Sequence, residues 1–349
     1  MEKVLILSLG RSGSLPIYAE NIVSNFDCDN YDILVSKNRF IKRRIKNSIE
    51  FYTYTNKFSF VLSTFFYLPL RVLFLLPRIY KDYHTLYLPY KHFWDILFIF
   101  IFKLFKRKVV FTVHDGVLHK GEKNFFTQLL SNIRLKNTSE YIFLTNYVKK
   151  IVEDKIESNK KRYVIPHPII ENEFVKKESK YNETRNILFL GRIDKYKGIE
   201  LLMNSAILSE SYYDKLIIAG KSNYQVKYID HSKIEILDKY LTEKEIGDLL
   251  SWADLLVLPY TEATQSGVIS LGIFSELPMI CTNVGGFSEQ LEKDECFWSE
   301  PNEEDLAAKI RTVFNDYQKI NDIKNKLKLK RTKLSWAEIS IRIEQVIFN

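Results

Sequence analysis

The sequence predicts an α/β protein made of two doubly wound domains that face each other across a cleft. Short apolar runs typical of buried parallel strands recur along the chain, and segments with helical periodicity separate them. The length of 349 residues is sufficient for two domains of ordinary size. The runs form two series, KVLILSL, KVVFTV, YIFLT and YVIPH in the first half and NILFLG, KLIIAG, IEILD, LLVLPY and PMICT in the second.

A charged segment, ENEFVKKESKYNETR at residues 171–185, divides the two series of strands. It has no apolar periodicity, and we therefore expect it to be a linker. The first domain is then expected over residues 1–170 and the second over residues 186–333.

The cysteines and the N-terminus indicate the compartment. Cys28, Cys281 and Cys296 lie far apart with neither paired nor metal-ligand spacing, so we expect reduced thiols and no disulfide framework. The opening MEKVLILSLG resembles a strand rather than a signal peptide, because its apolar run is short and wrongly flanked. The protein is expected in the cytoplasm.

Charge is unevenly divided between the two halves. Residues 1–168 carry a net charge of +13 and residues 169–349 one of −5, which together give the +8 of the whole chain. A basic first domain favours an anionic partner, such as a phosphorylated substrate or an acidic membrane surface. Nucleic acid is disfavoured because no recognition motif accompanies the basic residues.

Residues 58–106 contain two apolar segments with scattered Arg and Lys. Pro69, Arg71 and Pro77 interrupt the first, and the second is uncharged only from Ile96 to Phe102, so neither is a clean membrane span. One interpretation is a pair of buried helices that pack on the sheet. The other is an amphipathic surface on an anionic bilayer, to which IKRRIK (41–46) and KLFKRK (103–108) supply positive charge. Both can hold, because one face of a helix can pack while the other meets lipid.

The segment NILFLGRIDKYKGIELL (186–202) predicts a phosphate site. A strand ends at Gly191, where a glycine lets a ligand approach the backbone. Arg192 and Lys197 then flank a short loop, and Gly198 opens a helix. Two cations at the carboxyl end of a parallel strand suit a diphosphate, which Arg grips through two donors and Lys attracts as a point charge. The alternative is an ordinary solvated loop.

A second anion site is predicted in TEATQSGVISLG (261–272), between an apolar strand and a helix. Ser266 and Gly267 fall at the start of that helix, where unpaired N–H groups and the helix dipole favour an anion. Thr264 and Gln265 would add side-chain donors. The alternative is a plain N-cap, because a serine before an apolar helix needs no ligand.

The first domain offers a glycine turn, GRSGS (10–14), directly after its first strand. Backbone N–H groups of Gly10, Ser12 and Gly13 would be able to bind a phosphate group of a substrate. The turn is not a GxGxxG, which disfavours a nicotinamide site, and the chain has no GxxxxGK[ST], which excludes a P-loop.

Histidines follow the strand KVVFTV. His114 and Asp115 come directly after it, and His119 lies five residues beyond His114. Each histidine either reaches a substrate or hydrogen-bonds to local structure. No His/Cys/Asp cluster has metal-ligand spacing, so no metal is expected.

Six pieces of the sequence together resemble one enzyme family. Residues 191–202 have the form G-R-[IL]-x-x-x-K-G-[IV]-x-x-L, and the other pieces are TVHDG (112–116), FLTNYVKK (143–150), VIPHP (164–168), residues 258–289 and SWAEISIRIEQVI (335–347). In this order they resemble glycosyltransferase family 4, the group 1 nucleotide-sugar enzymes of GT-B fold, in which two Rossmann-like domains face each other. The last piece, within residues 334–349, looks like the family's terminal helix, which crosses back to the first domain.

The resemblance implies roles for the candidate residues. Arg192 and Lys197 would hold the donor diphosphate and stabilise the charge that builds on it as the sugar leaves, in place of a metal. His114 would contact the transferred sugar, by positioning it or by sharing positive charge in the transition state. The other implied donor contacts are Gly191, Glu262, Thr264, Gln265, Ser266, Gly267 and Val268, and those of an acceptor or phosphate loop are Gly10, Ser12, Gly13, Asp115 and His119.

The chain departs from the common family pattern at Leu271, where that pattern has a glutamate for the ribose. The stretch is similar to the family's ATQSG variant, found among surface-polysaccharide enzymes, and Glu262 would take part of the role of the pattern's first glutamate. Downstream, VGGFSE (284–289) supplies a glycine pair that either accommodates sugar hydroxyls or makes a tight turn.

The resemblance implies a retaining, metal-independent hexosyltransferase that uses a UDP- or GDP-sugar and no other cofactor. The expected acceptor is a lipid-linked saccharide or oligosaccharide of capsule, exopolysaccharide or lipopolysaccharide synthesis, used at the inner face of the cell membrane. One alternative is another GT-B sugar-nucleotide enzyme, such as an epimerase. Another is a non-catalytic, membrane-bound partner of an active transferase, for which Leu271 would be the signature.

Overall fold

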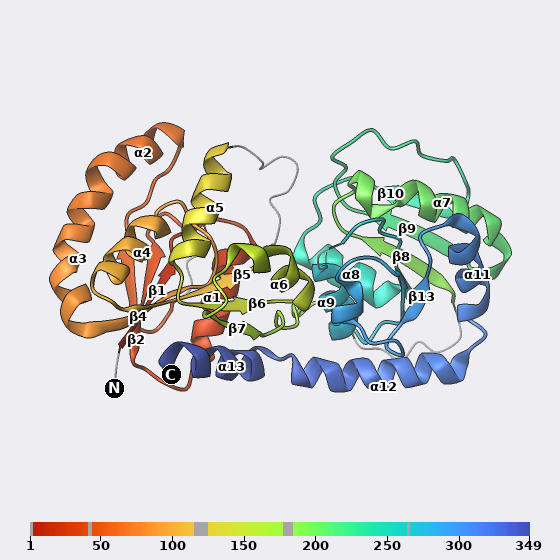
Figure 1. Ribbon diagram of the computed structural model, residues 1–349. Coiled ribbons are helices and arrows are strands. Elements are labelled where there is room, and N and C mark those ends of the chain that lie inside the picture. The colour runs from red at the N-terminus through yellow and green to blue at the C-terminus, as the bar shows by residue number, and fades with distance from the viewer. Residues whose placement is uncertain (1–2, 41–43, 115–124, 177–183, 264–265) are drawn as a thin grey trace. The chain divides into compact units, whose positions relative to one another are not determined.

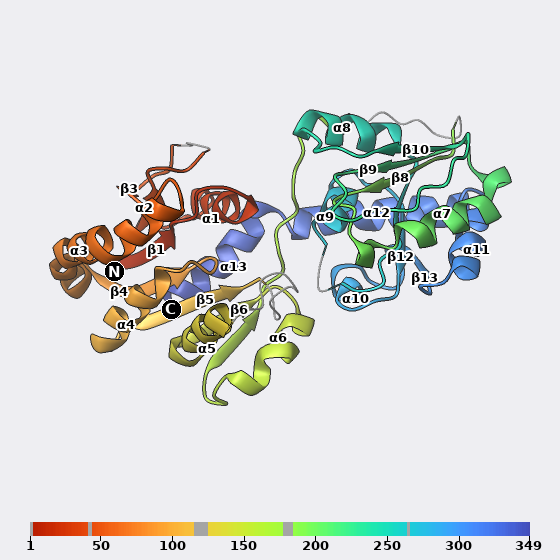
Figure 2. The same cartoon turned by 90° about the horizontal axis from the view of Figure 1, so that it is seen from above.

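The computed structural model describes residues 3–40, 44–114, 125–176, 184–263 and 266–349. The chain divides into two compact units, Met1–His167 with Trp336–Asn349 and Pro168–Ser335 (Figure 1; Figure 2). The described part of the segment expected to be a linker packs on the second unit, since the Asn172 side chain donates to the Glu243 carbonyl at 2.8 Å.

The first unit is built on a seven-stranded parallel sheet of order β3-β2-β1-β4-β5-β6-β7. Its strands are β1 (Lys3–Ser8), β2 (Tyr31–Ser36), β3 (Ser48–Phe51), β4 (Tyr83–Leu88), β5 (Lys108–Val113), β6 (Glu140–Phe143) and β7 (Lys161–Val164). Its helices are α1 (Ser14–Ser24), α2 (Lys57–Leu62), the π-helical η1 (Ser63–Tyr67), α3 (Leu68–Asp82), α4 (Asp95–Leu104), α5 (Phe125–Asn137), α6 (Asn146–Val152), the short η2 (Glu153–Lys155) and α13 (Trp336–Phe348). The terminal helix α13 packs beside α1, so the end of the chain completes this unit (Figure 1).

Strands β2, β3 and β4 are absent from the predicted series, although β2 and β4 flank β1. In β2 the pattern is obscured by Asp32, which interrupts the apolar run YDILVS but is itself buried. Its carboxylate accepts bonds from Lys3 and Arg78, both at 2.8 Å, and from the Tyr83 hydroxyl. A carboxylate paired in this way can occupy a sheet interior at which an isolated one would be costly.

The second unit has a six-stranded parallel sheet of order β10-β9-β8-β11-β12-β13. The strands are β8 (Asn186–Leu190), β9 (Lys215–Ala219), β10 (Ile234–Leu237), β11 (Leu255–Leu258), β12 (Met279–Thr282) and β13 (Phe297–Ser299). The helices are η3 (Lys195–Lys197), α7 (Ile199–Leu208), η4 (Glu210–Tyr212), α8 (Glu243–Trp252), α9 (Gly267–Phe274), α10 (Phe287–Gln290), α11 (Glu303–Val313) and α12 (Tyr317–Lys333). Because β8 and β11 are neighbours, both predicted anion segments begin at the same edge of this sheet.

The two apolar segments of residues 58–106 behave differently. Helix α4 is a core helix, in which Phe98, Ile99 and Phe102 are fully buried. Segments α2, η1 and α3 instead continue one another as a 26-residue helix, Lys57–Asp82, of whose most apolar window only 17% is buried. Its length and composition alone would allow it to span a membrane, despite the prolines that interrupt its sequence. Figure 1 shows α2 and α3 in orange along an outer side of the first unit.

Candidate functional site

Two glycines bring the predicted anion segments of the second unit together. Gly198, with φ of 69°, opens α7 in the left-handed region, and a Cβ there would lie 1.9 Å from the Pro259 carbonyl oxygen. The loop after β8 can therefore pack on the end of β11 only with glycine at this position. At Gly191, with φ of 127°, a Cβ would lie 3.4 Å from the Val268 side chain in the first turn of α9.

Lys197 lies against aromatic rings at this edge. Its Nζ is 3.7 Å from the centre of the Tyr260 ring and 5.0 Å from that of Tyr196. Burial lowers the pKa of the Lys197 amine to about 7, with a further lowering from the nearby Arg192 guanidinium and an opposing effect from Asp194. Lys197 is therefore a shielded cation that an incoming anion would hold in its charged form.

Arg192 differs from Lys197 in its exposure. Its side chain is 69% exposed, and its Nε lies 4.0 Å from Asp194 Oδ2. An exposed, weakly paired guanidinium is available to grip phosphate oxygens. The two predicted cations thus lie on one loop, one shielded and one in solvent.

Ser266 is the N-cap of α9. Its Oγ accepts the Val268 N–H at 3.2 Å and lies 3.3 Å from the Tyr260 hydroxyl. Its backbone is held by Gln290, which accepts the Ser266 N–H at 2.6 Å and donates to the Ser266 carbonyl at 3.1 Å. The plain N-cap of the sequence alternative is therefore present. The sequence did not predict this role of Gln290, and the only sequence signal for it is its position directly after VGGFSE.

The glycine pair of that segment makes a turn against the same loop. Gly285 has φ of 51°, and a Cβ there would lie 1.7 Å from the Ala263 carbonyl oxygen, to which Gly286 donates its N–H at 2.9 Å. This geometry favours the tight-turn interpretation of VGGFSE. Glu262 is exposed, whereas Leu271 packs partly buried against the core of the second unit. Thr264 and Gln265 lie outside the described residues.

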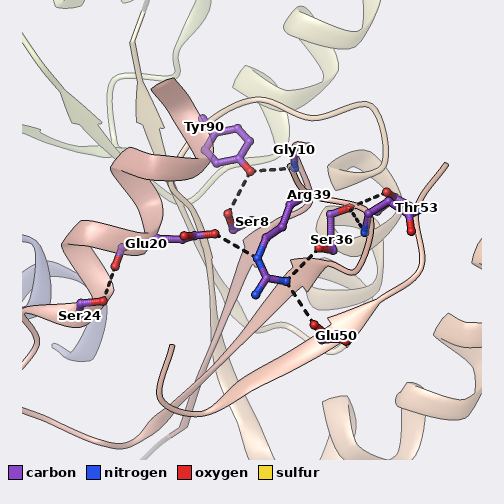
Figure 3. A network of polar contacts seen from close by, with 10 residues as sticks. Ser8, Gly10, Glu20, Ser24, Ser36, Arg39, Glu50, Thr53 and Tyr90 are labelled. Carbon is purple, nitrogen blue, oxygen red and sulfur yellow. Dashed lines mark hydrogen bonds and ion pairs between the residues drawn. The ribbon is translucent and has the colours of Figure 1, made fainter. Parts of the chain in front are cut away.

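In the first unit, the Gly10 amide is already used. Its N–H donates to the Tyr90 hydroxyl at 2.9 Å, and that hydroxyl lies 3.1 Å from Ser8 Oγ (Figure 3). A Cβ at Gly10 would lie 2.9 Å from the Tyr90 oxygen, so glycine is required by protein packing. The backbone-phosphate role predicted for Gly10 therefore meets a competing internal partner. Ser12 is exposed, and Gly13 begins α1 with open space around it.

A buried ion-pair network that the sequence did not reveal lies beside this turn (Figure 3). The Arg39 guanidinium donates to the Ser36 carbonyl at 3.0 Å and lies 3.6 Å from Glu20 and 3.5 Å from Glu50. Arg39 and Glu20 are both buried, so the pairing fixes the end of β2 against α1.

His114, at the end of β5, is hydrogen-bonded to the fold. Its Nε2 lies 2.8 Å from the Pro89 carbonyl, which can only accept, so Nε2 carries the proton and Nδ1 the lone pair. Burial lowers the pKa of His114 to about 3, with a further contribution from His167. A neutral imidazole can position a sugar but has no positive charge to share. Asp115 and His119 lie outside the described residues.

A cavity of about 110 Å³ lies next to His114 in the first unit. Polar and basic side chains contribute to its wall, among them Lys91, Gln128, Arg134 and Lys155. Arg134 is itself paired with the Asp95 carboxylate at 2.7 Å, so Lys91 and Lys155 are the lining cations outside that pair. Within the described ranges, no group of three His, Cys, Asp or Glu side chains could hold a metal ion.

Two parallel α/β sheets of this order, each with helices and with a terminal helix returning to the first unit, define a GT-B glycosyltransferase fold. Solved structures confirm the fold. The chain matches sucrose-phosphate synthase from Thermosynechococcus elongatus with a TM-score of 0.72 and 13% identity, over 99% of this chain and 98% of that one. It matches HepE from Anabaena, crystallised with UDP, with a TM-score of 0.75 and 15% identity over 99% of both chains.

The family resemblance is confirmed for the second unit. Residues 184–316 match the model of the family described as Glycosyl transferases group 1. A curated relative, the gpi3 subunit of phosphatidylinositol N-acetylglucosaminyltransferase from Schizosaccharomyces pombe, is 24% identical over 271 residues. That alignment covers 68% of this chain and spans 58% of the relative's length.

Proposed function

We propose that the protein is a retaining glycosyltransferase that moves a sugar from a nucleotide diphosphate to a lipid-linked saccharide. The observation that carries the proposal is that Lys197 and Ser266, the N-cap of α9, both contact Tyr260 at the adjacent ends of β8 and β11. Both groups lie within the segment that matches the group 1 family. An anion placed there would meet a cation on one side and a helix N-terminus on the other.

The reaction proposed for this site breaks the bond between the anomeric carbon of the sugar and the diphosphate oxygen. Negative charge then builds on the leaving diphosphate, where Lys197 and Arg192 would stabilise it. An acceptor hydroxyl forms the new bond to the anomeric carbon, and its proton passes to the leaving phosphate. No side-chain general base and no metal are needed in this scheme.

UDP is the nucleotide that we propose. Solved structures of similar fold include HepE bound to UDP and to UDP-glucose. Leu271 offers no carboxylate for the ribose, and Glu262 is an exposed acidic side chain of the loop that precedes α9. A ribose contact through Glu262 would be solvent-exposed and therefore weak.

On the first unit, we propose that neutral His114 positions the sugar and that the acceptor binds over the basic strand ends. The cavity beside His114, with Lys91 and Lys155 in its wall, supports an anionic acceptor such as a lipid diphosphate.

We also propose that the first unit docks on the inner leaflet of the cell membrane through one face of the helix Lys57–Asp82. Leu68, Val72 and Ile79 hold the helix to the fold, and Trp94 donates to Thr64 at 2.9 Å. The opposite face exposes the large apolar side chains Phe58, Val61, Leu62, Phe65, Phe66, Leu70, Leu73, Phe74 and Tyr80. Such a face, with Lys and Arg nearby, suits an anionic bilayer.

Nucleotide binding tests the enzymatic proposal. Wild-type protein should bind UDP in titration calorimetry. Arg192→Ala should raise the UDP Kd by about tenfold, the loss of affinity expected for one charge-assisted contact. Lys328→Ala, at an exposed cation of α12 in the same unit, is the matched control. If neither UDP nor GDP binds, and Arg192→Ala equals wild type, the transferase proposal is wrong and a non-catalytic partner subunit becomes the better assignment.

A further inference from the structure

We propose that Tyr260 is a positioning residue of the donor site, whose ring fixes the Lys197 ammonium while its hydroxyl fixes Ser266. The inference rests on the proposed function, because it joins the two groups expected to hold the diphosphate. Tyr260 follows β11 after a single proline, and its side chain is fully buried. One side chain thus touches both halves of the site.

The ring face forms one wall of the Lys197 site. The Lys197 ammonium lies 3.7 Å from the centre of the Tyr260 ring, and the Tyr196 ring, perpendicular to it, adds a second wall at 5.0 Å. A ring face attracts a cation through its quadrupole and places no fixed acceptor on the N–H donors. The rings therefore hold the Lys197 ammonium in place without occupying all three of its N–H donors.

The surroundings of Lys197 explain why this wall matters. Arg192 and Asp194 are the charged groups that act on it, and burial, the largest influence, lowers its pKa to about 7. Tyr260 supplies part of that burial. An ammonium that is poorly hydrated before the ligand arrives gains more from a diphosphate than a fully hydrated one would.

The Tyr260 hydroxyl contacts the second predicted anion segment, at the Ser266 N-cap. Ser266 Oγ accepts the Val268 N–H at 3.2 Å and lies 3.3 Å from the Tyr260 oxygen. A serine hydroxyl has two acceptor positions and one proton. If the Tyr260 hydroxyl donates, both acceptor positions are filled and the Ser266 proton is left for a phosphate oxygen.

Tyr260 is itself rigidly held. The Thr282 hydroxyl donates to its carbonyl at 2.5 Å, and the Phe287 ring packs on it with centres 5.0 Å apart. The next residue, Thr261, donates its N–H to the Tyr196 carbonyl at 2.8 Å, which ties the two walls together. A fixed ring is what a positioning role requires.

Double-mutant cycles on UDP affinity test both contacts. Tyr260→Phe should raise the UDP Kd by about 3–10-fold, the usual effect of one hydrogen bond, and should have no further effect in a Ser266→Ala background. Tyr260→Ala should raise the Kd by about tenfold or more, and most of that loss should vanish in a Lys197→Met background. Losses that simply add in both cycles would overturn the proposal.

A matched control separates positioning from stability. Tyr213 is also a fully buried tyrosine, with the Lys233 ammonium 5.5 Å from its ring, but it precedes β9 at the opposite end of the strands. Tyr213→Ala should lower the melting temperature at least as much as Tyr260→Ala and leave the UDP Kd unchanged. Equal effects of the two variants on UDP affinity would contradict a specific role.

A readout without nucleotide distinguishes this inference from the proposed function. Competitive acetylation of lysines, read by mass spectrometry across pH, should place the midpoint of Lys197 near 7 in wild type and in Tyr260→Phe. Tyr260→Ala, or Tyr260→Gln if the alanine variant does not fold, should raise that midpoint by about one pH unit because water or a polar group reaches the ammonium. An unmoved midpoint overturns the inference, whereas a moved midpoint in a protein that binds no UDP contradicts only the proposed function.

Discussion

The side-chain amide of Gln290 spans the backbone of Ser266, accepting its N–H at 2.6 Å and donating to its carbonyl at 3.1 Å. This pair of bonds ties the end of α10 to the start of α9. Gln290→Ala should therefore loosen the N-cap and raise the UDP Kd by about tenfold, since two hydrogen bonds to a buried backbone are lost. Gln318→Ala, at an exposed position of α12, is the control and should leave the Kd unchanged. Equal Kd values for the two variants in calorimetry would refute the role of Gln290.

UDP binding should take up a proton near neutral pH. The Lys197 amine has a pKa lowered to about 7 in the free protein, so above pH 7 much of it is neutral, and a bound diphosphate would restore its charge. Calorimetry in buffers of different ionisation enthalpy should show uptake approaching one proton per UDP at pH 8.5, where the phosphates of UDP are already fully ionised.

Lys197→Arg is the matched variant for proton uptake, because an arginine stays charged throughout this range. It should abolish the uptake even where it retains UDP affinity. Undiminished uptake in that variant would place the proton elsewhere.

Buried neutral histidines should make the first unit sensitive to acid. Burial lowers the pKa of His114 to about 3 and that of His92 to about 4. Because the unfolded chain binds these protons near pH 6.5 and the folded chain does not, stability is fully present above pH 6.5 and declines as pH falls towards 3. His114→Gln, which keeps an amide donor for Pro89, should flatten the decline in urea midpoint between pH 7.5 and 4.5. A decline as steep as that of wild type would show that His114 does not contribute.

Gly198 should tolerate no side chain. Alanine there would combine a left-handed backbone with a Cβ 1.9 Å from the Pro259 carbonyl oxygen. We expect Gly198→Ala to lower the free energy of unfolding by about 3 kcal/mol or more. It should also weaken UDP binding, because the loop that carries Arg192 and Lys197 would shift. Gly13→Ala also has positive φ, 90°, but no atom within 4 Å of the added carbon, so about 1 kcal/mol is expected. If chemical denaturation shows that the two variants lose similar amounts of stability, the positive φ and not the contact with Pro259 is the reason for glycine at position 198.

Charge on the exposed apolar face should release the protein from membranes. Phe65→Glu and Phe74→Glu place carboxylates at side chains that are 71% and 81% exposed, and flotation with anionic liposomes should fall by about tenfold or more. Tyr240→Glu, at an 80% exposed residue of the second unit, should float like wild type. Unfolding midpoints should be unchanged in all three variants. Flotation that survives both Phe variants would exclude this face as the docking surface.

Much of the second unit follows from local sequence. Three of its strands, β8, β9 and β11, contain continuous apolar runs that are followed by Gly or Pro, a pattern typical of strands buried in a parallel sheet. The G-R-x-x-x-x-K-G spacing placed Arg192 and Lys197 on one loop, since both lie within the few residues after β8. In the first unit, strand β2 did not follow, because Asp32 is tolerated only through partners that the fold brings from Lys3 and Arg78.

Tertiary structure alone decided what each candidate can do. No local pattern shows that Tyr90 would occupy the Gly10 amide, that Pro89 would fix the proton of His114, or that Gln290 would hold Ser266. The sequence by itself determined the two-domain α/β plan, the family resemblance and the two cations of the loop after β8, which depend on neighbouring residues and short spacings. Long-range packing determined which amides, rings and amines remain for a ligand, because partners distant along the chain compete for them.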